Sequence, residues 1–117
     1  DFANIIRQYE FFKQLKCIRW SYDASGERRT AITGALLKAK GLKGGKPDYE
    51  FITEGFINKI PVACYLYLEF KFGKGKQSDN QKEFEESLKK FGNVKYCVVR
   101  SVEEAINILG ENGILTK

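Results

Sequence analysis

The sequence predicts an α/β domain with a mixed central sheet flanked by helices. Two observations predict it. Segments that alternate like strands are interleaved with segments of helical spacing. The longest alternating segment, residues 61–72, is apolar on both faces for most of its length, as a central strand is. With 117 residues, of which 43% are hydrophobic and 30% charged, the chain fits a single domain over residues 1–117.

The first half of the chain predicts two helices and two strands. Residues 2–16 place apolar side chains at helical spacing, and residues 17–22 alternate as a short strand. Residues 28–40 predict a second helix, and the glycine-rich basic loop 41–45 ends it. Residues 48–53 predict a strand that opens just after a proline, which a central strand does not tolerate in its interior.

The second half predicts a strand, a helix, a strand and a last helix. Glu54-Gly55 begins a turn, and the strand 61–72 follows it. A serine N-cap opens each of the two helices, which span residues 78–91 and 101–109. Between them, residues 94–100 predict a strand. The whole order is therefore α-β-α-β-β-α-β-α.

The charge distribution points to a polyanionic partner. The net charge is +5, and the excess is clustered, with Lys43 and Lys46 in one loop and Lys74 and Lys76 in another. Phosphates attract such clusters and release counterions when they bind. A solvated surface that aids solubility is the alternative. No apolar run approaches the roughly 20 residues that span a bilayer, so no membrane partner is expected.

Cysteine and histidine usage narrows the chemistry. Three widely spaced cysteines, Cys17, Cys64 and Cys97, predict buried free thiols in a reducing, intracellular compartment. The chain contains no histidine, which excludes a Ser-His-Asp triad, a Cys-His pair and a His-ligated metal. A metal must therefore be held by oxygen, which favours Mg²⁺ or Mn²⁺.

Two acids and one lysine form the main candidate site. Glu69 and Lys71 are two residues apart in the predicted central strand, so their side chains point the same way. Asp48 opens the preceding strand, and pairing of the two strands would gather all three groups at one end of the sheet. Two carboxylates and an ammonium suit metal-assisted phosphodiester cleavage. The alternatives are a turn role for Asp48 and a solvent-facing ion pair for Glu69 and Lys71.

Two further residues are candidates with competing explanations. Gln81 lies on the apolar stripe of its helix and can aim an amide toward the acids, but Ser78 and Gln81 also fit an S-x-x-Q capping box. Glu10 borders the apolar face of the first helix, and a helix packed across the sheet would bring it to the metal. A solvated glutamate is the alternative.

These motifs, in this order, resemble the VRR-NUC branch of the PD-(D/E)xK nuclease superfamily. The resemblance rests on Gly45-Lys46-Pro47-Asp48, on Glu69-Phe70-Lys71, on Gln81 opening a helix, and on the segment 98–104. It covers nearly the whole chain. It implies a restriction-endonuclease-like core.

The resemblance also implies an activity and roles for the residues. It implies a structure-selective DNA endonuclease that uses Mg²⁺ or Mn²⁺, with Asp48, Glu69 and the carbonyl of Phe70 as metal ligands and Lys71 as the catalytic cation. It carries catalytic roles to Gln81 and Glu10 and implies a homodimer. The localisation expected is the cytoplasm of a bacterial or phage-infected cell, or the nucleus of a eukaryote. Backbone contacts to DNA are expected from the basic loops, at Lys43, Gly44, Gly45, Lys46, Lys74 and Lys76. A non-catalytic DNA-binding module on the same fold is the alternative.

Overall fold

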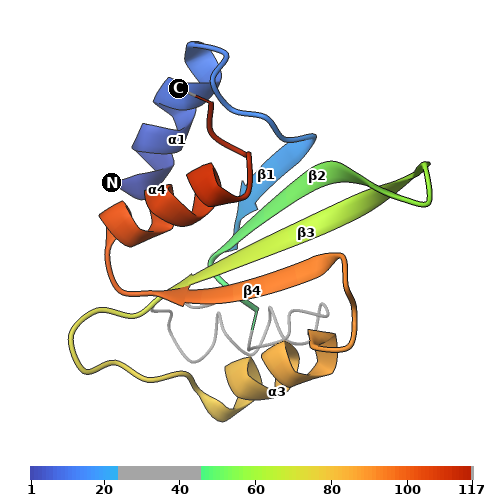
Figure 1. The fold of residues 1–117 in the computed structure, drawn as a ribbon. Helices are drawn as coiled ribbons and strands as arrows, with labels where there is room; N and C mark the ends of the chain where they lie inside the picture. Colours follow the sequence, from blue (N-terminus) through green and yellow to red (C-terminus); the bar gives the residue numbers. More distant parts are fainter. Residues whose placement is uncertain (24–45, 117) are drawn as a thin grey trace, which may run out of the picture.

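A four-stranded mixed sheet forms the centre of the molecule (Figure 1). The computed structural model describes residues 1–23 and 46–116. The predicted helix 28–40 and the predicted loop 41–45 lie outside the described residues. The α/β class and the mixed sheet predicted from sequence are confirmed.

The strands lie in the order β1-β2-β3-β4. Strand β1 (Arg19–Tyr22) pairs antiparallel with β2 (Tyr49–Ile57), and β2 pairs antiparallel with β3 (Ile60–Phe70). Strand β4 (Val94–Val99) runs parallel to β3. Strand β3 therefore has a neighbour on each side, as its two apolar faces predicted.

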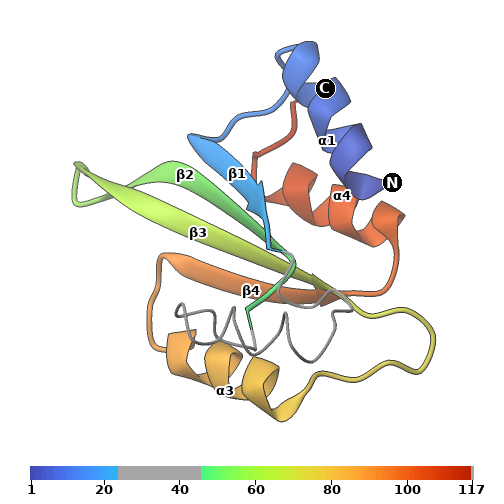
Figure 2. The same cartoon turned by 180° about the vertical axis from the view of Figure 1, so that it is seen from behind.

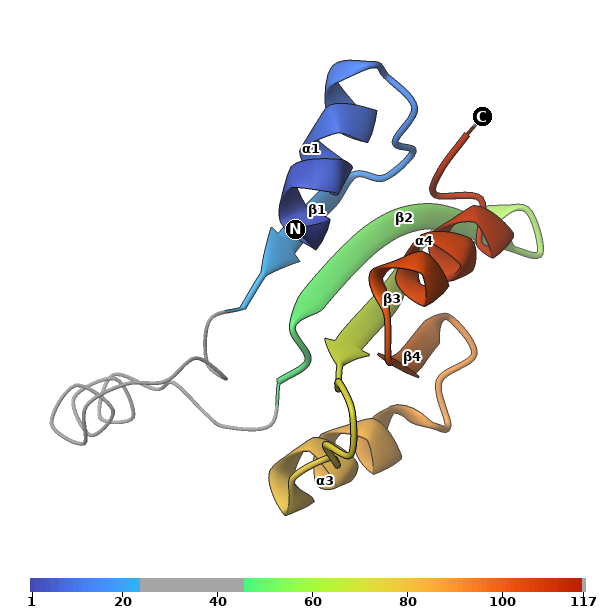
Figure 3. The ribbon, with the colours of Figure 1, turned by 90° about the vertical axis from the view of Figure 1, so that its left-hand side faces the viewer.

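Helices cover both faces of the sheet. Helix α1 (Phe2–Phe11) and helix α4 (Val102–Glu111) lie on one face, and helix α3 (Asp79–Leu88) lies on the other (Figures 1 and 3). Among the described helices, none is long and apolar enough to cross a membrane.

The hydrophobic core lies between the sheet and the α1/α4 layer. Its buried side chains come from both helices, from strands β2, β3 and β4, and from the segment after α4. They are Phe2, Ile6, Tyr49, Phe51, Leu66, Leu68, Val99, Ala105, Leu109 and Ile114. The α3 layer is thinner, because no residue of α3 is fully buried. One of its contacts is Phe84, whose ring meets Tyr67 edge-on at 5.7 Å between centroids.

The turn predicted at Glu54-Gly55 is wrong. Strand β2 continues through both residues to Ile57, and a two-residue turn at Asn58-Lys59 leads directly into β3. The hairpin projects beyond the rest of the sheet (Figure 2). Asn58 and Lys59 have φ angles of 50° and 69°, which is the type I′ geometry that the twist of a hairpin favours.

The first predicted helix is also too long. Helix α1 ends at Phe11 with Phe12 as its C-cap, and Lys13 adopts a φ of 56°. Phe12 lies within the predicted helix 2–16, yet it is 67% exposed, because the helix ends before its side chain can pack on the sheet. Phe72, the last residue of the predicted strand 61–72, lies beyond the end of β3 and is also exposed.

All three cysteines are free thiols, as expected, but each is only half-buried. Burial raises the pKa of Cys97 and of Cys17 above the ordinary thiol value. Both groups are therefore neutral near pH 7.

Lys59→Gly is expected to stabilise the protein by about 0.5–1 kcal/mol. A side chain at positive φ costs roughly 1–2 kcal/mol, and glycine removes this cost. Part of the gain is lost, because glycine gives up more conformational entropy than lysine when the chain folds. The change also creates the Asn-Gly pair that type I′ turns prefer. Urea unfolding measures the gain. Lys59→Ala keeps the unfavourable φ and is the control; an equal gain in that variant would contradict the explanation.

Candidate active site

Glu69 is buried at the end of the central strand. Its side chain has 0% exposure, and it is the one charged residue in the described part of the chain that is fully buried. Tyr96 of β4 donates its hydroxyl hydrogen to Glu69 Oε1. Glu69 Oε2 is buried with no hydrogen-bond partner, the one such side-chain atom among the described residues. The solvent-facing ion pair considered for Glu69 is therefore wrong.

The Asp48 side chain is hydrogen-bonded to the main chain of the residue that follows Glu69. The last ladder pair between β2 and β3 joins Tyr49 to Leu68, so one further step places Asp48 opposite Glu69. Opposite residues of an antiparallel pair have Cα atoms roughly 4.5–5.5 Å apart. Asp48 Oδ2 accepts a hydrogen bond from Phe70 N at 2.7 Å.

The environment of Asp48 disfavours its charge. Burial raises the pKa of this carboxyl above its ordinary value, although the Phe70 N–H bond and the nearby Lys71 ammonium act in the opposite direction. Asp48 also lines an open hollow of about 380 Å³ together with Phe2, Phe70 and Val102, on the α1/α4 side of the sheet. This hollow exposes Asp48 to a ligand, but Glu69 does not line it.

Lys71 follows β3 and is half-buried. Its N–H donates to the carbonyl of Val99 at 2.9 Å, which extends the β3–β4 pairing past the end of the strand. Since its ammonium lowers the pKa of Asp48, the two side chains lie within electrostatic reach of each other. The structure thus gathers Asp48, Glu69 and Lys71 at one end of β3, as the strand pairing predicted.

Arg100 shapes the loop that follows Lys71. Its Nη1 donates to the carbonyl of Gly75 at 2.6 Å and lies 3.3 Å from that of Gly73. Gly73 has a φ of 60°, a conformation that suits glycine. The loop is therefore tied to the end of β4, and it carries Lys74 and Lys76, both exposed, beside the candidate site.

A hydrogen-bonded chain continues outward from Tyr96. The Gln77 side chain hydrogen-bonds the Tyr96 hydroxyl, and Gln77 Nε2 donates to Glu85 Oε1 of α3 at 3.2 Å. Burial, followed by the bond to Glu69, raises the pKa of Tyr96 far above its ordinary value. Tyr96 is therefore a protonated donor at neutral pH.

The structure does not bring Glu10 to this site. Glu10 Oε2 accepts a hydrogen bond from Trp20 Nε1 at 3.2 Å on the α1 side of the sheet. Trp20 pairs with Phe51, and Phe51 with Leu66, so these side chains share the core face, whereas Glu69 alternates onto the α3 face. The expectation that α1 would carry Glu10 to a metal beside Glu69 is wrong, because the sheet separates the two carboxylates.

Gln81 closes a capping box at the start of α3. Ser78 N donates to Gln81 Oε1 at 2.9 Å, and Gln81 N donates to Ser78 Oγ at 3.2 Å. The capping explanation is confirmed. The amide oxygen is thereby committed to the helix end, and the catalytic role of Gln81 stays a prediction.

The predicted DNA-contact residues are partly described. Lys46 is exposed, and its Nζ lies 3.8 Å from Asp23 Oδ2. Lys43, Gly44 and Gly45 lie outside the described residues. Asp23 also donates its N–H to the carbonyl of Asp48 at 2.8 Å, and its charge contributes to the raised pKa of Asp48.

The oxygen ligands at this site suit a hard cation that takes its remaining ligands from water or substrate. Within residues 1–23 and 46–116, no group of three or more His, Cys, Asp or Glu side chains could hold a metal ion. Asp48, Glu69 and the Phe70 carbonyl offer two carboxylates and one main-chain oxygen. Mg²⁺ is commonly bound by one or two carboxylates, with water and substrate phosphate as the other ligands. The unpaired Glu69 Oε2 is consistent with this chemistry.

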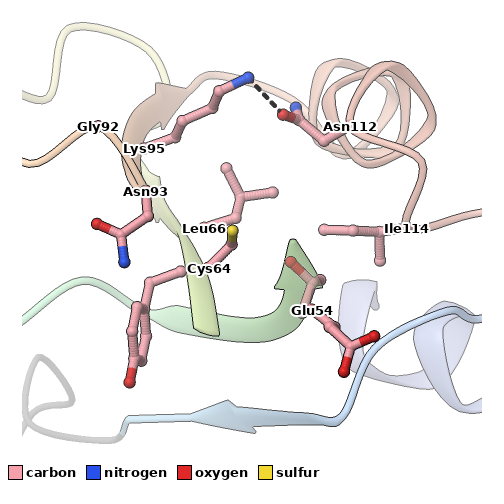
Figure 4. A pocket seen from close by; sticks show the side chains of 10 residues that line it. Glu54, Cys64, Leu66, Gly92, Asn93, Lys95, Asn112 and Ile114 are labelled. Carbon is pink, nitrogen blue, oxygen red and sulfur yellow. Dashed lines mark hydrogen bonds between the residues drawn. The ribbon is translucent and has the colours of Figure 1, made fainter. Parts of the chain in front are cut away.

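A separate hollow of about 250 Å³ lies toward the other end of β3 (Figure 4). Three of its polar side chains form hydrogen bonds within the fold. Lys95 Nζ donates to Asn112 Oδ1 at 2.8 Å, and Asn93 Nδ2 donates to the carbonyl of Ala63 at 2.8 Å. These bonds hold α4 and the loop before β4 against the sheet, so the residues serve the fold.

Sequence reasoning missed Tyr96 and Arg100 as parts of the site. Tyr96 lies in an apolar strand, where its type and spacing predict core packing. Arg100 was considered only as part of the segment 98–104. The one available signal was position in the chain: Tyr96 lies within the strand that pairs with the Glu69 strand, and Arg100 directly follows that strand.

Comparison with protein families, with curated proteins and with solved structures finds no match to this chain.

Asp48→Asn is expected to preserve or raise stability near pH 7, whereas Asp48→Ala is expected to lower it by about 1–3 kcal/mol. Asparagine keeps an acceptor for Phe70 N–H and removes the partly buried charge, while alanine leaves that N–H unpaired. Since the folded state raises the pKa of Asp48 above 3.8, the charge opposes folding as pH rises through this range.

The pH dependence supplies the check. The advantage of Asp48→Asn over the wild type should be largest at neutral pH and shrink as pH falls toward 4, where Asp48 becomes protonated. Denaturant unfolding at several pH values measures the difference. A gap that widens on acidification would show that the sign is wrong.

Proposed function

We propose that this chain is a divalent-metal-dependent DNA endonuclease with a PD-(D/E)xK core of the VRR-NUC type. Its substrate is a branched or flapped DNA, cut with little sequence specificity. The observation that carries the proposal is the fully buried Glu69, with one carboxylate oxygen unpaired, beside Asp48 and Lys71 at the end of the central strand. Stability alone does not favour such a group in this place.

The residues divide the chemistry between them. Asp48, Glu69 and the Phe70 carbonyl would hold Mg²⁺ or Mn²⁺, which supplies a polarised phosphoryl oxygen and a water of lowered pKa. Lys71 places a positive charge beside Asp48, where charge develops on the phosphate in the transition state. Glu69 presents an oxygen that cannot turn to solvent, so its orientation is fixed before a ligand arrives.

The basic loop after β3 supports DNA as the substrate. Lys74 and Lys76 are exposed on a loop that Arg100 fastens at Gly73 and Gly75. Lysines on a fixed loop contact phosphates without reading bases, which agrees with low sequence specificity. A homodimer would present two such sites to the two strands of a branched substrate; this part of the proposal rests on the family resemblance.

Lys71→Ala is expected to lose cleavage by at least about 100-fold and to retain DNA binding. The reason is that the ammonium stabilises the charge formed during the reaction more than it holds the bound DNA. Cleavage of branched, flapped and linear DNA is measured with Mn²⁺ and with chelator, and DNA affinity is measured with Ca²⁺ present.

The alternative is a non-catalytic DNA-binding module. It would show salt-dependent DNA binding and no metal-dependent cleavage of any substrate by the wild-type protein. That outcome would overturn the proposed activity while leaving the DNA partner intact. A wild-type protein without salt-dependent DNA affinity would overturn both.

Lys74→Ala with Lys76→Ala is expected to weaken DNA binding about equally for all sequences. If both lysines contact phosphates, the slope of log affinity against log salt concentration falls by about 2. Fluorescence anisotropy at several salt concentrations measures the slope. The control is Lys13→Ala with Lys16→Ala, which removes the same charge from the exposed segment just after α1. Equal changes in both double variants would indicate a general charge effect.

A further inference from the structure

Two tyrosine–glutamate pairs lie on the α3 face of the sheet. Tyr67 of β3 and Tyr96 of β4 are register partners, and each donates its hydroxyl hydrogen to a carboxylate. Tyr67 bonds Glu50 Oε2 at 2.8 Å. Tyr96 bonds Glu69. The two pairs are alike in chemistry and lie side by side, but only one includes a residue of the candidate site.

The surroundings of the two carboxylates differ. Glu50 is half-buried, so part of its carboxylate remains open to water. Glu69 has 0% exposure, so water does not replace a missing partner there. The Tyr96 hydroxyl occupies Oε1 and leaves Oε2 as the unpaired atom. Tyr96 therefore decides which oxygen of Glu69 is available.

Contacts with the loop before α3, with α3 and with β3 fix the position of the Tyr96 side chain. The Gln77 side chain hydrogen-bonds the Tyr96 hydroxyl, and Gln77 in turn donates to Glu85 of α3. The ring of Tyr96 lies 6.2 Å from that of Phe84 and 6.3 Å from that of Tyr67, measured between centroids. Helix α3 and the loop before it thus fix the tyrosine that orients Glu69.

We infer that Tyr96 is a positioning residue, which holds the Glu69 carboxylate by Oε1 so that Oε2 faces a divalent cation. Groups that orient a metal ligand commonly change metal affinity by 10- to 100-fold when they are removed. The inference rests on the proposed function. Its ligand is a hard divalent cation.

Tyr96→Phe is the test variant, and Tyr67→Phe is the matched control. Each removes one hydroxyl and one tyrosine–carboxylate bond from the same face of the sheet. The loss of thermal stability is expected to be larger in Tyr96→Phe, because water cannot replace the missing partner of the buried Glu69 carboxylate. Mn²⁺ affinity, measured by calorimetry on the full chain, should fall roughly 10- to 100-fold in Tyr96→Phe and change less than about twofold in Tyr67→Phe.

A second readout separates positioning from a general loss of structure. Cleavage by Tyr96→Phe should recover toward the wild-type rate as Mn²⁺ is raised, because the variant lacks affinity for the cation and not the reacting groups. Gln77→Ala, which leaves the Tyr96 and Glu69 side chains intact, should weaken Mn²⁺ binding in the same direction by a smaller factor.

The outcomes are distinguishable. If the wild type binds Mn²⁺ and cleaves DNA while Tyr96→Phe and Tyr67→Phe bind Mn²⁺ equally well, the role of Tyr96 is overturned and the nuclease proposal stands. If the wild type binds no Mn²⁺, the metal-dependent function fails first, and the inference falls with it. Should Tyr96→Phe fail to fold, the Gln77→Ala affinity decides: an unchanged value overturns the inference.

Discussion

The rest of the site depends on one buried carboxylate. Glu69 lies on an inner strand of the sheet with no exposed surface, and only one of its oxygens is paired. Leaving a polar atom unpaired in such a place costs on the order of 1–3 kcal/mol. A chain shaped by stability alone would favour an apolar side chain at this position, as it has one place earlier at Leu68. A buried side chain that lowers the stability of the fold is typical of functional sites.

The topology explains why the charged side chains of the candidate site lie at this end of the sheet. Strands β3 and β4 are parallel, so their C-terminal ends lie at the same edge. Glu69 and Lys71 come from the end of the first strand, and Arg100 follows the end of the second. The same alternation that sends Leu68 into the core sends Glu69 to the opposite face. One strand thus serves both the core and the site.

Periodicity and turn chemistry predicted most of the elements, and the failures have local causes. The pair Glu54-Gly55 predicts a turn. Gly55 lies inside β2, where a Cβ would come within 2.6 Å of Cys64 Sγ, so the glycine serves a close approach between strands. The capping box of Ser78 and Gln81 was foreseen because it depends on local spacing. The distance between Glu10 and Glu69 depends on which face α1 covers, and spacing along the chain does not specify this.

The comparison of Tyr67 with Tyr96 shows why the site itself was only partly predictable. Both tyrosines lie in apolar strands, both bond a glutamate, and burial is the first cause of a raised pKa in both. Their difference lies in the acceptor, since Glu50 retains access to water and Glu69 does not. A hydroxyl beside a hydrated carboxylate only adds a hydrogen bond. A hydroxyl beside an enclosed carboxylate also determines which carboxylate oxygen remains for a ligand. This arrangement depends on the packing of β2, β3, β4 and α3, which the sequence pattern does not specify.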